Sequence, residues 1–265
     1  MKKLLFILII SIITTGTAFP QEKVLAVGEE LIYRVYFGFI RLGQVKFKLT
    51  NHYIEKGEDI YTAIAEIKSY EGIPFISLNY LFETQMSTQS KKAELYSRQF
   101  YSTEFKDKSI TRIEYTFEYD KAEIKIQKET DGRIENFEKV KIENSAKYQD
   151  GLSLFYNARM QSFGNQNYNI PVYINEKESS VKYSFNMNED VVSTDAIDYH
   201  VAVIKIAGVA DFVGLFGLTG EFISWLSADE ARIPIKAQFN VSIGSISLEL
   251  EKYKRTGWEP PKFTN

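Results

Sequence analysis

The chain has 265 residues with no cysteine, 44% hydrophobic residues, 25% charged residues and a formal net charge of −3. This composition excludes a disordered chain, a collagen-like repeat and a disulfide scaffold. Because the charge is mildly acidic and the lysines are scattered, it also argues against nucleic acid as a partner.

The first 18 residues have the layout of a secretory signal peptide. Two lysines precede an apolar run at 4–13, and small residues stand at Gly16 and Ala18. The run is short of the ~20 residues that a membrane-spanning helix needs, although a retained anchor is the alternative. We therefore expect cleavage near Ala18 and no membrane span afterwards. The expected location is the periplasm, with secretion as the alternative.

The rest of the chain favours β-strands, beginning with its 17 tyrosines and 19 phenylalanines. Apolar and polar side chains alternate in four stretches, at 44–49, 112–119, 181–188 and 233–243. Since successive strand residues point to opposite faces, each stretch has one face for a core and one for water. Asp131-Gly132, between two further β-rich runs, is a strong hairpin signal. The pattern predicts a mainly β fold, in which a large curved antiparallel sheet rolls into a barrel-like or half-barrel shape.

One segment breaks the alternation and predicts a single main helix at about 150–163. Leu152, Phe155 and Tyr156 fall along one stripe, Asp150 is a natural N-cap, and a glycine follows as a natural stop. A helix laid against a sheet needs one apolar stripe of this kind. We expect these three side chains to be buried.

No proline-rich or glycine-rich linker divides the chain after the signal peptide, which predicts a single β-rich domain over residues 19–265. Segments 82–100 and 222–239 both run from a phenylalanine through a polar turn to a strand that ends Gln-Phe. A duplication would give two similar half-sheets, and chance alternation explains the echo about as well. Segment 208–217 is expected to form a short helix or a loop.

Four segments are similar, in order and spacing, to the family known as domain of unknown function 3108. They are residues 28–51, 150–159, 171–174 and 220–250. The run WLSADEARIP, which starts at Trp225, is the most specific part. Where many relatives are expected to have an acidic residue, this chain has Ala228. The resemblance implies an exported bacterial protein with a β-rich fold, and it implies no reaction.

No pattern in the chain predicts a catalytic residue, a cofactor site or a metal site. Ser179 and Lys182 have the S-x-x-K spacing of serine acyl enzymes, but strand alternation points them to opposite faces. His52 and His200 lie far apart and belong to no metal-ligand motif. We expect no enzyme activity.

Trp225, Asp229 and Arg232 form the candidate ligand-binding cluster, and two interpretations of them are open. In the first, Trp225 lines a cleft while the charged turn orients a polar group of the ligand. In the second, Trp225 packs in the core while Arg232 pairs with a carboxylate to fix a hairpin.

Three functions are compatible with these patterns. The first is a non-catalytic periplasmic protein that binds or carries an apolar or amphipathic ligand, such as a lipid, in the concave face of the roll. The second is an envelope structural or assembly protein whose strand edges pair with a protein partner. The third is an envelope hydrolase that uses two carboxylates. The carboxylate pairs are Glu29-Glu30, Glu58-Asp59, Glu189-Asp190 and Asp229-Glu230.

Overall fold

The computed structural model describes residues 23–74, 76–88, 94–143, 145–241 and 244–264. The expected signal peptide and its cleavage site lie outside these residues. Within them, no helix combines the length and apolarity that crossing a bilayer requires.

The described residues form fourteen strands, one α-helix and one short 3-10 helix, in agreement with the predicted mainly β class. The first eight strands are β1 (Glu30–Phe37), β2 (Ile40–Glu55), β3 (Glu58–Ser69), β4 (Asn79–Thr88), β5 (Leu95–Lys106), β6 (Ser109–Glu118), β7 (Glu123–Thr130) and β8 (Arg133–Lys141). The helix α1 (Gly151–Met160) follows. The remaining elements are β9 (Asn167–Ile174), β10 (Lys177–Thr194), β11 (Ile197–Ala210), η2 (Leu215–Gly217), β12 (Gly220–Ser227), β13 (Pro234–Asn240) and β14 (Ser245–Lys254).

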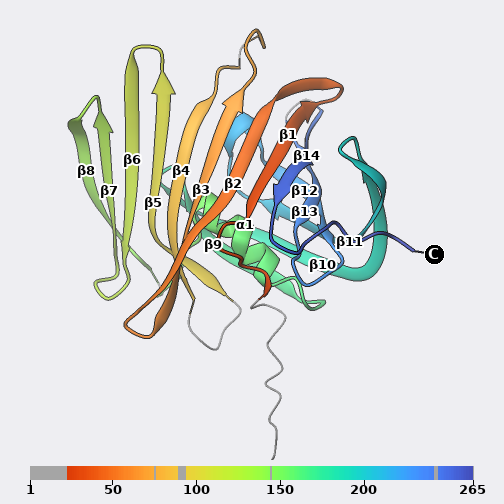
Figure 1. The fold of residues 1–265 in the computed structure, drawn as a ribbon. Coiled ribbons are helices and arrows are strands. Elements are labelled where there is room, and N and C mark those ends of the chain that lie inside the picture. Colours follow the sequence, from red (N-terminus) through yellow and green to blue (C-terminus); the bar gives the residue numbers. More distant parts are fainter. Residues whose placement is uncertain (1–22, 75, 89–93, 144, 242–243, 265) are drawn as a thin grey trace, which may run out of the picture.

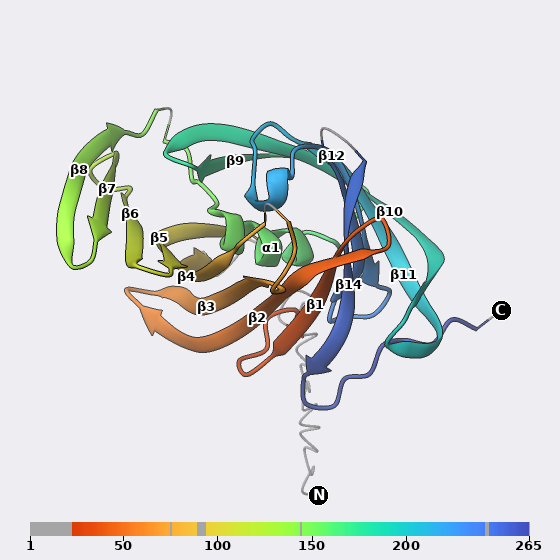
Figure 2. The same cartoon turned by 90° about the horizontal axis from the view of Figure 1, so that it is seen from above.

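All fourteen strands belong to one antiparallel sheet with β8 and β9 at its edges. Its order is β8-β7-β6-β5-β4-β3-β2-β1-β14-β13-β12-β11-β10-β9. Each strand pairs with the next strand in the chain, except that β8 does not pair with β9. The pairing of β1 with β14 joins the two meanders side by side. The sheet curls around α1, so the predicted roll is confirmed (Figures 1 and 2).

A glycine within a strand allows close contact with the neighbouring strand. A Cβ atom at Gly208, near the end of β11, would lie 2.3 Å from the backbone oxygen of Lys182 on β10. Because no real side chain tolerates that distance, only glycine fits there. Glycines inside strands are typical of tight bends and close backbone approach.

Besides the β1–β14 pair, the two halves of the roll are also joined by a short segment before α1. The backbone N–H of Ser97 on β5 donates to the oxygen of Tyr148 at 2.8 Å. On the other side, Gln149 exchanges backbone hydrogen bonds with Pro171 and Tyr173 of β9 at 3.0 and 2.9 Å. Residues 148 and 149 therefore bridge β5 to β9, while β7 and β8 extend beyond this contact (Figure 2).

Helix α1 begins at Asp150 because that carboxylate caps it. Asp150 accepts hydrogen bonds from the backbone N–H groups of Leu152 at 2.7 Å and Ser153 at 2.8 Å, and the Ser153 hydroxyl accepts from the Asp150 N–H. Two strand hydroxyls, from Thr84 and Ser97, also donate to the carboxylate at 2.6 Å each. The cap thus ties the start of α1 to β4 and β5. Burial raises the pKa of Asp150.

The single helix matches the prediction, with two differences in detail. It ends at Met160, before the predicted residue 163, because a tight turn follows in which the Ser162 hydroxyl donates to the Arg159 oxygen at 2.7 Å. Leu152 and Tyr156 are buried as predicted, whereas the prediction is wrong for Phe155, which is only partly buried. Its ring stacks on Phe47, with the ring centres 4.2 Å apart, and faces a cavity.

Segment 208–217 contains the end of a strand, a loop and a helical turn. Strand β11 continues to Ala210, and the short helix η2 occupies Leu215–Gly217. The predicted short helix or loop therefore begins after Ala210. In Figure 2, η2 lies over the interior of the roll.

Removing the cap carboxylate with Asp150→Ala should lower the free energy of unfolding by about 2 kcal/mol or more. The reason is that two hydroxyls and two backbone N–H groups lose a buried acceptor. Asp120→Ala, in the exposed turn after β6, is the control and should change it by less than about 0.5 kcal/mol. Urea unfolding of both variants checks this, and equal losses would contradict it.

Candidate functional site

The interior of the roll contains a cavity of about 630 Å³. Strands of both meanders contribute to its wall, and α1 contributes its cavity-facing side chains. Along most of the strands the lining residues are two positions apart, such as Phe100, Ser102 and Glu104 on β5. The same alternation that builds the sheet therefore supplies the wall.

The wall is largely aromatic. From the first meander it includes Tyr33, Phe47, Tyr80, Phe82, Phe100 and Tyr115. From the helix and the second meander it includes Phe155, Tyr173, Tyr183, Phe212, Phe222 and Phe239. Such rings offer large apolar contact surfaces with little conformational freedom to lose.

Polar lining residues gather at the end of the cavity away from the Asp150 cap. Glu104 lies near the end of β5, and its neighbours across the sheet are Tyr80 on β4 and Thr111 on β6. The turn between β9 and β10 adds Asn175 and Glu176 to the lining, where the Glu176 N–H donates to the Tyr115 hydroxyl at 3.1 Å. The cavity therefore has an apolar interior and a polar end.

Glu104 is the carboxylate among these groups whose contacts are most defined. The Tyr80 hydroxyl donates to it at 2.6 Å, and the Lys106 ammonium lies 2.9 Å away. Burial by itself would raise the pKa of Glu104, but the hydrogen bonds from Tyr80 and Lys106 outweigh it and lower that pKa. The group is thus an anion at neutral pH.

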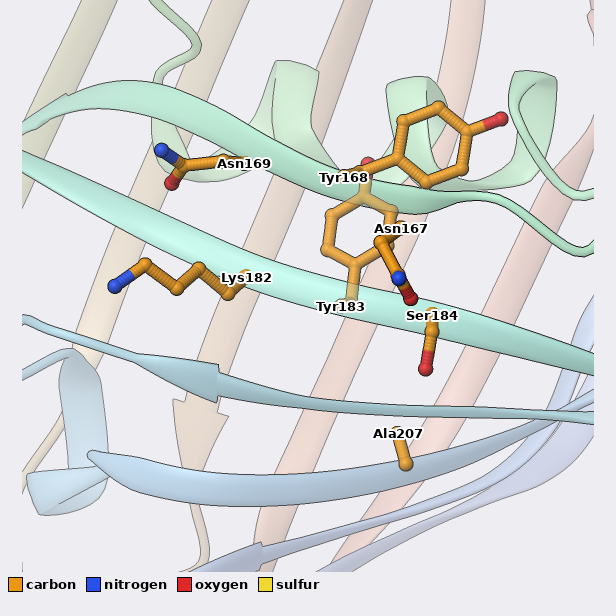
Figure 3. Close-up of a pocket in the computed structure, with 7 residues that line it drawn as sticks. All are labelled: Asn167, Tyr168, Asn169, Lys182, Tyr183, Ser184 and Ala207. Carbon is orange, nitrogen blue, oxygen red and sulfur yellow. The ribbon is translucent and has the colours of Figure 1, made fainter.

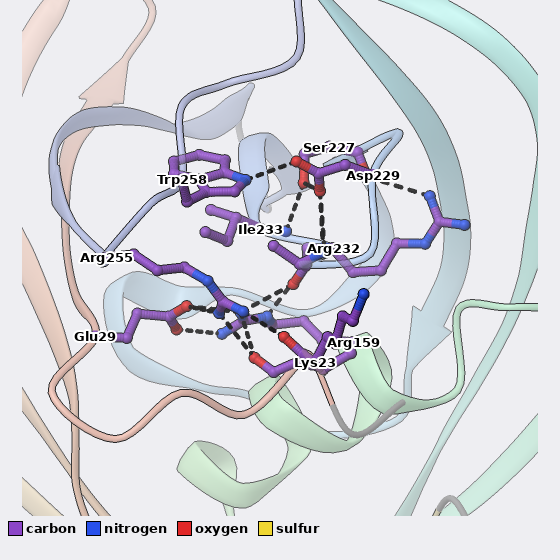
Figure 4. Close-up of polar contacts among 11 residues, drawn as sticks. Lys23, Glu29, Arg159, Ser227, Asp229, Arg232, Ile233, Arg255 and Trp258 are labelled. Carbon is purple, nitrogen blue, oxygen red and sulfur yellow. Dashed lines mark hydrogen bonds and ion pairs between the residues drawn. The ribbon is translucent and has the colours of Figure 1, made fainter. Parts of the chain in front are cut away.

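Arg159 of α1 is the sole cation among the described lining residues, and it is completely buried. Its guanidinium donates to Glu29 at 2.6 and 3.0 Å, and to the backbone oxygens of Val24, Ala231 and Arg232. Arg255 donates to the same Glu29 carboxylate, so the two arginines converge on it (Figure 4). Most of the N–H donors of Arg159 therefore bond to acceptors within the protein.

Sequence reasoning did not identify this buried ion cluster. Arg159 stands in the apolar stripe of the predicted helix, three residues after Tyr156, and that placement was a usable signal. Its partners are far away in the chain, since Glu29 precedes β1 and Arg255 follows β14. No local pattern could pair them.

Trp225 does not line the cavity. Its neighbours on β12, Ser224 and Leu226, do line it, so the alternation directs the Trp225 side chain to the opposite face. There the indole is partly buried and packs against a second apolar cluster that includes Val203 and Ile233. Its position agrees with the packing role in the second interpretation.

Asp229 and Arg232 lie together in the turn between β12 and β13, outside the cavity lining. Asp229 accepts hydrogen bonds from the Ser227 hydroxyl at 2.7 Å, the Ala231 N–H at 3.0 Å and the Trp258 indole at 2.6 Å (Figure 4). The Arg232 guanidinium donates to the Ser227 backbone oxygen at 3.2 Å. Both residues fix the turn, although the hydrogen bond of Arg232 goes to a carbonyl and not to the predicted carboxylate.

A shallow depression of about 380 Å³ lies over β9, β10 and β11 (Figure 3). Asn167, Asn169 and Lys182 line it and are exposed. No group of three or more acidic or histidine side chains able to hold a metal occurs within the described ranges. The cavity inside the roll is therefore the better candidate site.

The family described as Protein of unknown function (DUF3108) matches residues 32–251. None of the curated proteins matches the chain.

Three solved structures resemble the fold at low identity. A β-barrel-like protein of domain of unknown function DUF1849 from Brucella abortus has 13% identity and a TM-score of 0.48, covering 87% of this chain and 98% of its own. A proposed exported protein with a YmcC-like fold from Bacteroides fragilis has 9% identity and a TM-score of 0.35, with 87% and 97% covered. A proposed lipoprotein from Parabacteroides distasonis has 11% identity and a TM-score of 0.38, with 87% and 96% covered.

Glu29→Gln should lower the free energy of unfolding by about 3–5 kcal/mol, because it leaves two arginines, one of them fully buried, without their counter-charge. Glu30→Gln is the control at the next residue. Glu30 pairs with Lys48 at 2.9 Å and Lys46 at 3.6 Å on a partly exposed surface, so its loss should cost about 1 kcal/mol or less. Chemical unfolding checks the difference, and similar midpoints for the two variants would refute it.

Proposed function

The chain belongs to the DUF3108 family, a family of unknown function, and we propose that it is a non-catalytic protein that binds or carries an apolar or amphipathic small molecule. The observation that carries this proposal is the aromatic cavity of about 630 Å³ inside the roll. Pockets for small molecules usually measure roughly 300–1,000 Å³ and have mostly apolar walls with a few polar groups. The cavity fits both criteria.

An apolar cavity that stays unfilled lowers the stability of a fold. Lining atoms that face unfilled space lack the packing contacts that atoms of a filled core have. Apolar walls also hold water poorly. A ligand that fills the space would restore the lost contacts, and this supports a binding role.

The distribution of polar groups suggests how an amphipathic ligand would lie. Its apolar chain would run along Phe82, Phe100 and Phe155, and its polar end would lie near Glu104 and Thr111. The interior has few hydrogen-bond partners to offer, so a polar group there would be left unpaired at a cost.

A second function, assembly with a protein partner, is favoured by the edge strand β8. Almost all of its residues are exposed, and Ile134 and Phe137 have exposed fractions of 63% and 54%. An exposed edge offers unpaired backbone groups to a strand of another chain. An Ile134→Lys substitution would weaken such pairing without touching the cavity.

We propose that the protein acts outside the cytoplasm, in the periplasm of a bacterium. The support is the order of basic, apolar and small residues over 1–18. A carrier for apolar molecules is useful where such molecules must cross an aqueous compartment.

The cavity proposal predicts that Ala237→Phe lowers the affinity for dodecanol at least tenfold in isothermal titration calorimetry. Ala237 lines the cavity from β13, so a phenyl ring there would occupy the space of the ligand. Gln238→Phe places the same side chain on the opposite face of the same strand and should leave affinity unchanged. Equal affinities for both variants would place the binding site elsewhere.

The export proposal predicts a mature chain that starts at or within a few residues of Phe19. Intact-mass measurement of protein recovered from the periplasm checks this. Recovery of the chain with Met1 in a membrane fraction would contradict it.

A further inference from the structure

We infer that the cavity selects amphiphiles whose polar end is uncharged or cationic, that it discriminates against carboxylates, and that Glu104 is the specificity-determining residue. This inference rests on the proposed binding function. It concerns the charge at the polar end of the cavity and not the apolar contacts.

The charged lining residues that the structure describes are two acids and one base: Glu104, Glu176 and Arg159. Arg159 is neutralised by Glu29 and hydrogen bonded to three backbone oxygens, so most of its N–H donors are already used within the protein. The charge available to a ligand is therefore negative.

Glu104 faces the cavity with a side chain that is 23% exposed. It follows Phe100 and Ser102 on the inner face of β5, at the boundary between the aromatic wall and the polar end. A charge in this partly enclosed position is screened by water less than a surface charge is. Its field therefore reaches the space that the polar end of a ligand would occupy.

Lys106 reduces this field without reversing it. Its side chain is 62% exposed, and it is not among the residues that line the cavity. An exposed ammonium on a flexible stem is well solvated, so its compensation of Glu104 is incomplete. A ligand inside the cavity meets the carboxylate first.

The other groups at this end suit a neutral polar group. Thr111 and Thr219 bring hydroxyls that both donate and accept hydrogen bonds. The Tyr80 hydroxyl donates its proton to Glu104, so it can only accept a hydrogen bond from a ligand. A hydroxyl or an ammonium can donate to these acceptors, whereas a carboxylate cannot.

The test uses three amphiphiles with the same chain and different ends: dodecylamine, dodecanol and dodecanoate. Each is titrated into the mature protein below its aggregation concentration, at neutral pH and low ionic strength. Dodecylamine should bind about five- to tenfold more tightly than dodecanoate, with dodecanol between them. High salt should reduce the ratio, because it screens the partly exposed carboxylate.

Glu104→Gln should remove most of this preference. The substitution deletes the negative charge and frees Lys106, so dodecanoate affinity should rise while dodecylamine affinity falls. Glu83→Gln on the neighbouring β4 is the matched control, since Glu83 follows cavity-lining Phe82 and is itself absent from the cavity lining. The control should keep the wild-type ratio.

Lys106→Gln provides a second test that does not depend on the folding of the Glu104 variant. It removes the outside partner of Glu104, so the ratio of dodecylamine to dodecanoate affinity should increase. Binding of none of the three amphiphiles would overturn the proposed function itself. Binding with dodecanoate equal to or tighter than dodecylamine would overturn the charge selection alone and leave the cavity as a binding site.

Discussion

The convergence of Arg159 and Arg255 on Glu29 is the interaction on which the rest of the architecture depends. It joins the segment before β1, the helix and the segment after β14 through one buried carboxylate. A buried charge is stable only next to its counter-charge. The ion pair between Arg159 and Glu29 therefore fixes the position of α1 relative to the sheet. The Asp150 cap holds the other end of the helix to β4 and β5. Because α1 is held at both ends, the sheet has a fixed object to curl around.

The fixed helix also explains why the roll is partly hollow. One short helix, together with the 148–149 bridge, holds the two meanders apart at one end while aromatic side chains converge from both. Phe155 is an example of incomplete packing, because its ring stacks on Phe47 on one side and borders the cavity on the other. Closing the cavity would require the helix to move, and its buried ion cluster resists that.

The sequence predicted what local patterns determine and missed what distant pairing determines. Alternation is a property of neighbouring residues, so the strands, the antiparallel sheet and the capped helix could be predicted from it. A wall residue and a core residue have the same alternation, and this is why the residues that line the cavity and the incomplete burial of Phe155 could not be predicted from it. Trp225 was a candidate because tryptophan is common in binding sites. It lies between the cavity-lining Ser224 and Leu226 on β12, so its side chain is on the other face of the sheet. The partners Glu29, Arg159 and Arg255 are brought together only by the complete fold.

The pairing of β1 with β14 has a consequence for the order of folding. The first strand of the sheet pairs on one side with β2, which follows it at once, and on the other with the last strand of the chain. Contacts of such long sequence separation form slowly, since the loop entropy must be overcome first. Each meander can assemble from local hairpins, but the seam between them must wait for the C-terminus. Until then β1 is an open edge able to pair with another chain, so the time between synthesis of β1 and arrival of β14 is when this protein is most exposed to aggregation.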